Sequence, residues 1–149
     1  MTAEEELDGF IAKFEPALAA SVREVVAAMR ARLPGAVIPV YDNYNALAIA
    51  FGPTDRVKDI LFSIAVYPRW VSLFLVGGQA LPDPEGMLSG EGATMRHVRL
   101  TEGLATFQLP AVQALMEAAL DLAGRPLDAG RPQQVIIKSI SAKQRPRRP

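Results

Sequence analysis

The sequence predicts an α+β domain in which helices cover an antiparallel sheet. Two helical stretches open the chain, and four strand-like runs follow between residues 36 and 76 with only turn-like segments between them. Parallel neighbours would require long crossover connections, so this order favours a meander of antiparallel strands. Half of the 149 residues are hydrophobic, which is enough to form one buried core.

The first two elements are predicted to be helices. Thr2 and Glu5 have the spacing of a capping box at a helix start. An apolar stripe at helical spacing follows, made of Leu7, Phe10, Ile11 and Phe14. Pro16 suits the first turn of a second helix, because its missing N–H costs nothing there. The helical period then continues until the Pro-Gly pair at residues 34 and 35 ends it.

Four strand-like runs come next: "AVIPVY", "NALAIAFG", "DILFSIAVY" and "WVSLFLV". Pro39 lies inside the first run. It suits an edge strand, because proline has no N–H to donate to a neighbouring strand. Only Pro68 and Arg69 separate the third run from the fourth, so these two are predicted to form an antiparallel hairpin.

The second half of the chain is predicted to add two strands and a helix. Residues 77–94 are loop-like, and "MRHVRL" reads as a short strand. A helix begins at Pro110 and ends at Gly124, and "QQVIIKSI" is a final strand. We expect residues 1–140 to form a single domain and residues 141–149 to form a basic, flexible C-terminal tail.

Composition limits the class of protein. The chain has no cysteine, which excludes disulfides, thiolate metal sites and a cysteine nucleophile, and this fits a reducing compartment. The acidic start lacks the order of charges of a signal peptide, and no apolar run approaches the roughly 20 residues that cross a bilayer. These features predict a soluble cytoplasmic protein with no membrane partner, and no cofactor is predicted.

The formal net charge of zero hides an asymmetry between body and tail. The last twelve residues carry five cations and no acid, so residues 1–137 hold eleven cations against sixteen anions. A basic tail could bind nucleic acid through phosphate groups, but the acidic body disfavours that partner elsewhere. The oligomeric state is not predicted.

The order of these motifs resembles a known family. A helix, "LPGAV", a tyrosine-bearing corner, the "FSIAVYPRWVSLFL" hairpin, a Gly-rich loop, "RHVRL" and a closing helix resemble the YdhG-like family, catalogued as domain of unknown function 1801. The resemblance covers roughly Leu7 to Ala123. It implies a small α+β sandwich with an antiparallel sheet covered by helices. Some relatives are described as frataxin-like iron chaperones, so the resemblance also implies iron as a candidate ligand.

Polar and aromatic residues in three segments suggest a ligand-binding cleft. They lie in "YDNYN", in "YPRW" and at the start of "RHVRL". Amide, phenol and guanidinium groups orient small polar ligands or grip carboxylate and phosphate. The predicted cleft residues are Tyr41, Asn43, Tyr44, Tyr67, Arg69, Trp70 and Arg96. The simpler interpretation is that "YDNYN" and "YPRW" are ordinary strand corners.

Two other functions are weighed. Glu4 and Asp8 are one helical turn apart and could share a hard cation, although acids in a first turn also suit the helix dipole. An enzyme could use Asp42, Arg96 and His97 in acid–base roles, but no nucleophile motif accompanies them. We therefore predict no catalytic residues, and a non-enzymatic domain that binds a small ligand or a partner is the leading hypothesis.

Overall fold

The computed structural model describes the whole chain, residues 1–149. It contains four α-helices and six strands. The helices are α1 (Ala3–Ala12), α2 (Pro16–Arg32), α3 (Leu104–Phe107) and α4 (Pro110–Ala123). The strands are β1 (Val37–Asp42), β2 (Leu47–Phe51), β3 (Phe62–Val66), β4 (Val71–Val76), β5 (Met95–Arg99) and β6 (Gln134–Ile140). Two short 3-10 turns, η1 (Val57–Asp59) and η2 (Gly78–Ala80), lie in the loops.

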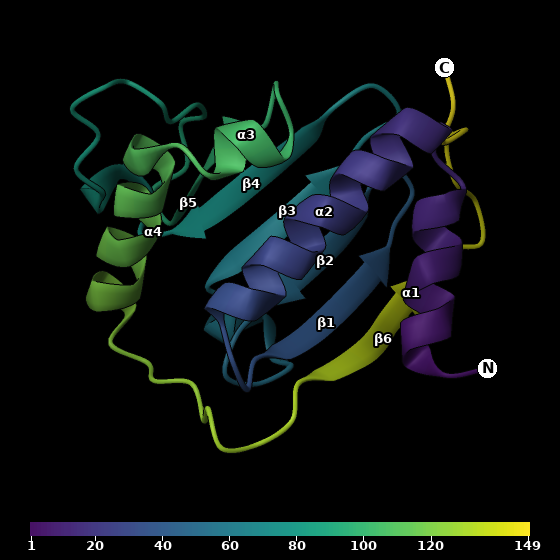
Figure 1. Cartoon of the computed structure of the whole chain (residues 1–149), viewed down its shortest axis with the longest axis horizontal. Coiled ribbons are helices and arrows are strands. Elements are labelled where there is room, and N and C mark those ends of the chain that lie inside the picture. Colours follow the sequence, from purple (N-terminus) through teal and green to yellow (C-terminus); the bar gives the residue numbers. More distant parts are fainter.

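The six strands form one sheet in the order β5-β4-β3-β2-β1-β6. Strands β1 to β5 are an antiparallel meander, and β6 pairs parallel to β1. Figure 1 shows α2 lying across one face of the sheet, with α1 near β6 and α4 near β4. The α+β class is therefore confirmed, whereas the sheet is mixed because its last strand is parallel.

The helix boundaries follow the predicted signals. Thr2 caps α1 in a capping box, with its side chain accepting from the N–H of Glu5 while the Glu5 carboxylate accepts from the N–H of Thr2. Pro16 and Pro110 stand in the first turns of α2 and α4, and Gly124 ends α4 in the left-handed conformation. The predicted starts of these three helices are confirmed, as are the predicted ends of α2 and α4.

Alternation along the strands separates a buried face from an outer face. Side chains at Leu47, Ile49 and Phe51 of β2 are fully buried beneath the helices, and their partners at residues 62, 64 and 66 of β3 are buried too. The intervening residues of each strand point to the outer face. The predicted hairpin between β3 and β4 is confirmed, since the N–H of Tyr67 donates to the carbonyl of Trp70 at 2.9 Å.

The prediction that Pro39 marks an edge strand is wrong. Strand β1 is an inner strand that pairs with both β2 and β6. Its ladder with β2 runs from Val40 to Asp42, and only an isolated bridge joins Val37 to Gly52 beyond it. Pro39 lies opposite Ala50 in the same register, and because it has no N–H to donate, the β1–β2 ladder is interrupted there.

A long connection brings β6 to the opposite edge of the sheet from β5. Residues 124–133 pass along the lower end of the sheet in Figure 1. Arg131 donates to the carbonyls of Gly35 and Pro53, and the side-chain amide of Gln133 donates to the carbonyls of Arg30 and Leu33 at the end of α2. The two bonds from Gln133 supply donors to carbonyls at the end of α2, where the helix itself provides few.

The outer face of the sheet carries no helix. The helices pack on the other face, where the buried apolar side chains form one cluster of 32 residues. None of the helices combines the length and the apolar character needed to cross a bilayer.

Candidate functional site

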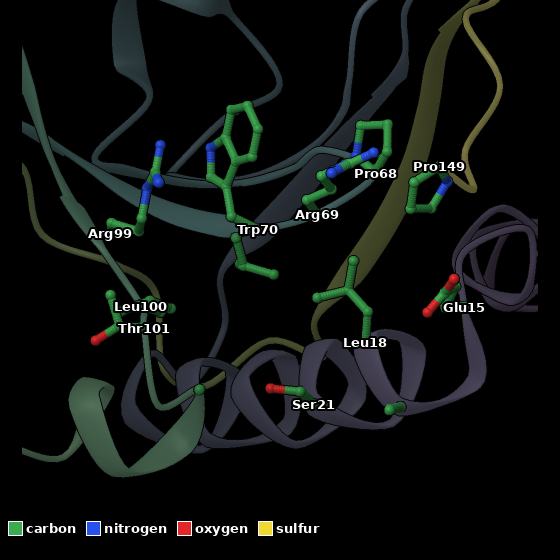
Figure 2. A pocket seen from close by; sticks show the side chains of 13 residues that line it. Glu15, Leu18, Ser21, Pro68, Arg69, Trp70, Arg99, Leu100, Thr101 and Pro149 are labelled. Atoms are coloured by element: carbon green, nitrogen blue, oxygen red, sulfur yellow. The ribbon is translucent and has the colours of Figure 1, made fainter.

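The largest cleft lies at the end of the sheet where the β3–β4 hairpin turns. It measures about 850 Å³ and is bounded by the hairpin, the start of α2 and the loop between β5 and α3. Figure 2 shows the hairpin and β5 on one side of this cleft and α2 on the other. The side chains that line it and bear on its chemistry are Glu15, Ser21, Arg69, Trp70, Arg99 and Thr101.

The hairpin fixes an aromatic and cationic stack at the rim of the cleft. The ring of Tyr67 stacks on Trp70 with centroids 4.7 Å apart, and the guanidinium of Arg99 lies 4.6 Å from the Trp70 centroid. Because β4 lies between β3 and β5, Tyr67 and Arg99 flank Trp70 from opposite sides. In Figure 2 Trp70 and Arg99 point away from α2. The indole therefore holds Arg99 in place and has no free face for a ligand.

Two arginines at this cleft have no acidic partner. Arg69 and Arg99 are exposed, and neither makes a side-chain hydrogen bond or an ion pair. The cleft contains one acid, Glu15, which faces it from the start of α2, together with the hydroxyls of Ser21 and Thr101. Free guanidinium groups at the rim of a cleft are suited to a carboxylate or phosphate group.

A close backbone approach shapes the floor of the cleft. Gly103 has a φ of +57°, and a Cβ at this position would lie 2.3 Å from the Oγ of Ser21. Glycine suits this position because few other residues adopt its positive φ, and a Cβ here would force the Oγ of Ser21 to move.

The "YDNYN" corner binds the chain's own C-terminal segment. The carbonyl of Tyr44 accepts from the N–H of Arg145 at 2.9 Å, and the carbonyl of Asn43 accepts from the guanidinium of Arg147 at 2.6 Å. The Asn43 side chain accepts from the hydroxyl of Ser139. Residues 141–149, which the sequence suggests to be a flexible tail, thus lie against this corner, and Pro149 reaches the rim of the cleft.

Asp42 is the buried centre of this contact. Its carboxylate is 1% exposed and pairs at 2.8 Å with both Lys13 and Arg147, and the Arg147 side chain is itself 3% exposed. Burial alone would raise the pKa of the Asp42 carboxyl, but hydrogen bonds from these two cations outweigh it and hold the pKa below its ordinary value. The residue therefore carries a structural charge that joins α1, β1 and the C-terminal segment.

Four of the predicted cleft residues do not join Arg69 and Trp70, and three of them belong to the "YDNYN" corner. Asn43 and Tyr44 contact the C-terminal segment, and Tyr41 lies on the outer side of β1 opposite Ala48 with its hydroxyl buried and unpaired. Tyr67 contributes through its stack on Trp70.

Arg96 lies at the far end of β5. Its partner across the ladder is Leu75, which is five positions from Trp70 and therefore about 17 Å away along β4. The Arg96 side chain donates to the carbonyl of Gly92 at 3.0 Å. The expected grouping of three segments is thus corrected, and Arg99 is the residue of β5 that reaches the cleft.

The hypothesis that Asp42 and His97 act together in acid–base chemistry is wrong. The two residues lie on β1 and β5, which are separated by three strands and so by about 19 Å. His97 packs on the ring of Phe74 on the outer face, with centroids 4.8 Å apart.

The acids of the first helix are paired with arginines of α2. Glu4 forms a bidentate pair with Arg30 at 2.8 and 2.9 Å, and Asp8 pairs with Arg23 at 2.9 Å. The hydrogen bond from Arg30 lowers the pKa of Glu4. No group of three or more His, Cys, Asp or Glu side chains is arranged to hold a metal ion. A cation bound by Glu4 and Asp8 would have to displace both arginines.

Comparison with known proteins adds no relative. No family model, curated protein or solved structure matches this chain. The interpretation of the cleft therefore depends on its geometry.

Sequence reasoning missed Glu15, Ser21, Arg99 and Thr101 as cleft residues. Alternation along "MRHVRL" places Arg99 on the side of β5 away from the core, but its position beside Trp70 depends on the β4–β5 register, which pairs it with Ser72. A weak signal was present for Thr101, because the "TEG" after the strand is a turn with a glycine. No pattern in the sequence places the start of α2 opposite the hairpin.

Proposed function

We propose that this protein is a non-enzymatic binding domain of the YdhG-like sandwich type, and that it binds a small anionic ligand at the rim of the cleft formed by the hairpin and the end of β5. The ligand would carry more than one carboxylate or phosphate group, because Arg69 and Arg99 offer two guanidinium groups at this rim, on either side of Trp70. The order of helices and strands agrees with the resemblance noted in the sequence.

One observation carries this proposal: the two arginines at the cleft are free. Eight of the twelve arginines donate side-chain hydrogen bonds to carboxylates, carbonyls or amide oxygens, and both arginines of the cleft are among the four that do not. A guanidinium group has five donors, and a ligand with carboxylate or phosphate oxygens satisfies several of them at once.

The binding role is favoured over catalysis by the residue types present. The cleft has serine and threonine hydroxyls but no histidine beside them, and Glu15 stands at the rim in solvent. A nucleophile requires an adjacent base to activate it, and none is provided here.

The experiment is a calorimetric titration with citrate, which carries several carboxylates. We expect saturable binding by the wild-type protein, and a loss of about tenfold in affinity in Arg69→Gln and in Arg99→Gln, since a charge-assisted hydrogen bond contributes about 1.4 kcal/mol or more. Arg56→Gln is the matched control, because Arg56 is exposed, makes no side-chain hydrogen bond and lies outside the cleft. Equal binding by all four proteins, or no binding by the wild type, would reject the proposal.

A further inference from the structure

A second hollow lies on the outer face of the sheet, away from the cleft. It measures about 640 Å³, and seven of its ten lining residues are hydrophobic. Its floor consists of small side chains on β2 and β3, namely Ala48, Ser63 and Ala65, of which Ala48 and Ala65 are paired across the strands. Larger apolar side chains form its walls: Val57 and Ile60 on one side, and Phe74, Val76 and Met95 on the other. We call this hollow the outer groove.

The outer groove is an exposed apolar surface. Val57 on η1 is 71% exposed, a large fraction for an apolar side chain inside an ordered turn. The small residues of the floor let a slender molecule approach the backbone of the sheet closely, while the walls confine it sideways. A largely apolar groove of this volume is in the range of small-molecule sites.

A single charged side chain lines the outer groove, and it is free. Lys58 makes no ion pair and no side-chain hydrogen bond. The two acids next to it in the sequence are engaged elsewhere: Asp55 pairs with Lys138 at 2.9 Å, and Asp59 is held by Thr54 and Arg125. The groove therefore combines an apolar floor with one unpaired cation, which is complementary to a molecule with an apolar chain and one negative charge.

We propose that the outer groove binds a medium-chain alkyl carboxylate, with its chain along the floor of Ala48, Ser63 and Ala65 and its carboxylate beside Lys58. Burial of the chain supplies most of the affinity, because each methylene removed from water is favourable. The charge of Lys58 fixes the direction of the chain and excludes cationic molecules of the same shape.

A second copy of this chain fits the outer groove less well. In a twofold dimer formed through this face, the same patch lies on both subunits. Two hollows would then face each other around the axis and leave a void, which close packing disfavours. The two Lys58 side chains would also be brought to the same interface without an acid to pair with either.

The experiment is a titration of the full chain with hexanoate, octanoate and decanoate below their micelle concentrations. We expect the dissociation constant to fall about fourfold for each methylene added, until the chain fills the groove. Decyltrimethylammonium, which has a matched chain and the opposite charge, is expected to bind at least tenfold more weakly than decanoate. Sedimentation of the ligand-free protein reports whether the face forms a dimer instead.

Three variants identify the groove as the site. Ala65→Leu fills the floor and should weaken decanoate binding at least tenfold, and Val57→Ser should weaken it several-fold while changing only an exposed wall residue. Lys58→Gln should weaken it about two- to fivefold, as expected for an exposed charge, whereas Lys143→Gln, an exposed lysine elsewhere, should leave it unchanged. Equal binding of decanoate by the wild type, Ala65→Leu and Val57→Ser would overturn the proposal. So would equal affinity for the cationic ligand, or dimerisation without any decanoate binding.

The outcome is independent of the anion cleft. The groove and the cleft share no lining residue, so Arg69→Gln should bind decanoate like the wild type. Failure of decanoate binding would leave the citrate result untouched, and the reverse also holds.

Discussion

Arg147 illustrates how a single residue determines the character of a segment. The basic sequence around it predicts a solvated tail, yet its guanidinium is buried against Asp42 and lies 5.7 Å from the ring centroid of Phe14. A carboxylate removed from water needs compensation by opposite charge and hydrogen bonds. In the sequence Arg147 is 105 positions from Asp42 and Phe14 is 28 positions from it, so the meeting of these three residues is a product of the tertiary fold.

We expect Arg147→Ala to destabilise the protein by about 3 kcal/mol, because it leaves Asp42 buried with Lys13 as its only cation. For a chain of this size the loss corresponds to a fall of about 6 to 12 °C in Tm, measured by calorimetry. Arg145→Ala is the matched control. Its side chain is exposed and makes no hydrogen bond, so its effect should stay within about 0.5 kcal/mol. Equal effects of the two changes would show that the pair contributes nothing specific.

At the scale of elements, the sequence predicts most of the structure correctly. Capping boxes, first-turn prolines and alternation are local signals, so α1, α2, α4 and the β3–β4 hairpin follow from short stretches of sequence. The inner position of β1 could not be predicted in the same way, because it depends on β6 crossing to that edge. Pro39 correctly indicates a missing ladder bond. An inner strand with an interrupted ladder accommodates a proline as well as an edge strand does.

The candidate site was predicted only in part for the same reason. Arg69 and Trp70 belong to one local hairpin, and both lie at the cleft. The remaining walls come from α2 and the β5–α3 loop, whose positions are set by how the helices pack on the sheet. The "YDNYN" corner was correctly singled out as polar and aromatic, but its partner is a segment nearly a hundred residues further along the chain.

The contact between α2 and the loop that leads into α3 gives a prediction at the scale of elements. Gly103→Ala should destabilise the protein by about 2 to 3 kcal/mol in urea unfolding, because its backbone conformation excludes a Cβ and that Cβ would meet Ser21. Gly124→Ala is the control. It also has a positive φ, of +58°, but lies in the left-handed helical region with open space around it, so it should cost only about 1 kcal/mol. Similar losses in both variants would mean that the close approach of the loop to α2 is not required.

At the scale of the whole molecule, ion pairs join segments that are distant in the sequence. Glu4 with Arg30, Asp59 with Arg125, Asp55 with Lys138, and Asp42 with Arg147 connect the first helix pair, the meander and the final crossover. The pKa of each of these four carboxyls is lowered in the folded protein. A lowered pKa means that the stabilisation is present above the unfolded value of about 4 and is lost as the pH falls through the folded value.

Burial predicts which of these pairs dominates acid unfolding. Asp42 is 1% exposed, whereas Asp55 is 41% exposed and its pair is screened by water and salt. We therefore expect the unfolding free energy of Asp42→Asn to be lower than that of the wild type at pH 7 and to fall less between pH 5 and pH 3, since the residue that takes up the proton is gone. Asp55→Asn should follow the wild-type curve closely, most of all in 1 M salt. Urea unfolding at a series of pH values measures both slopes, and parallel slopes for Asp42→Asn and the wild type would show that acid acts through the other carboxylates instead, the buried Asp59 included.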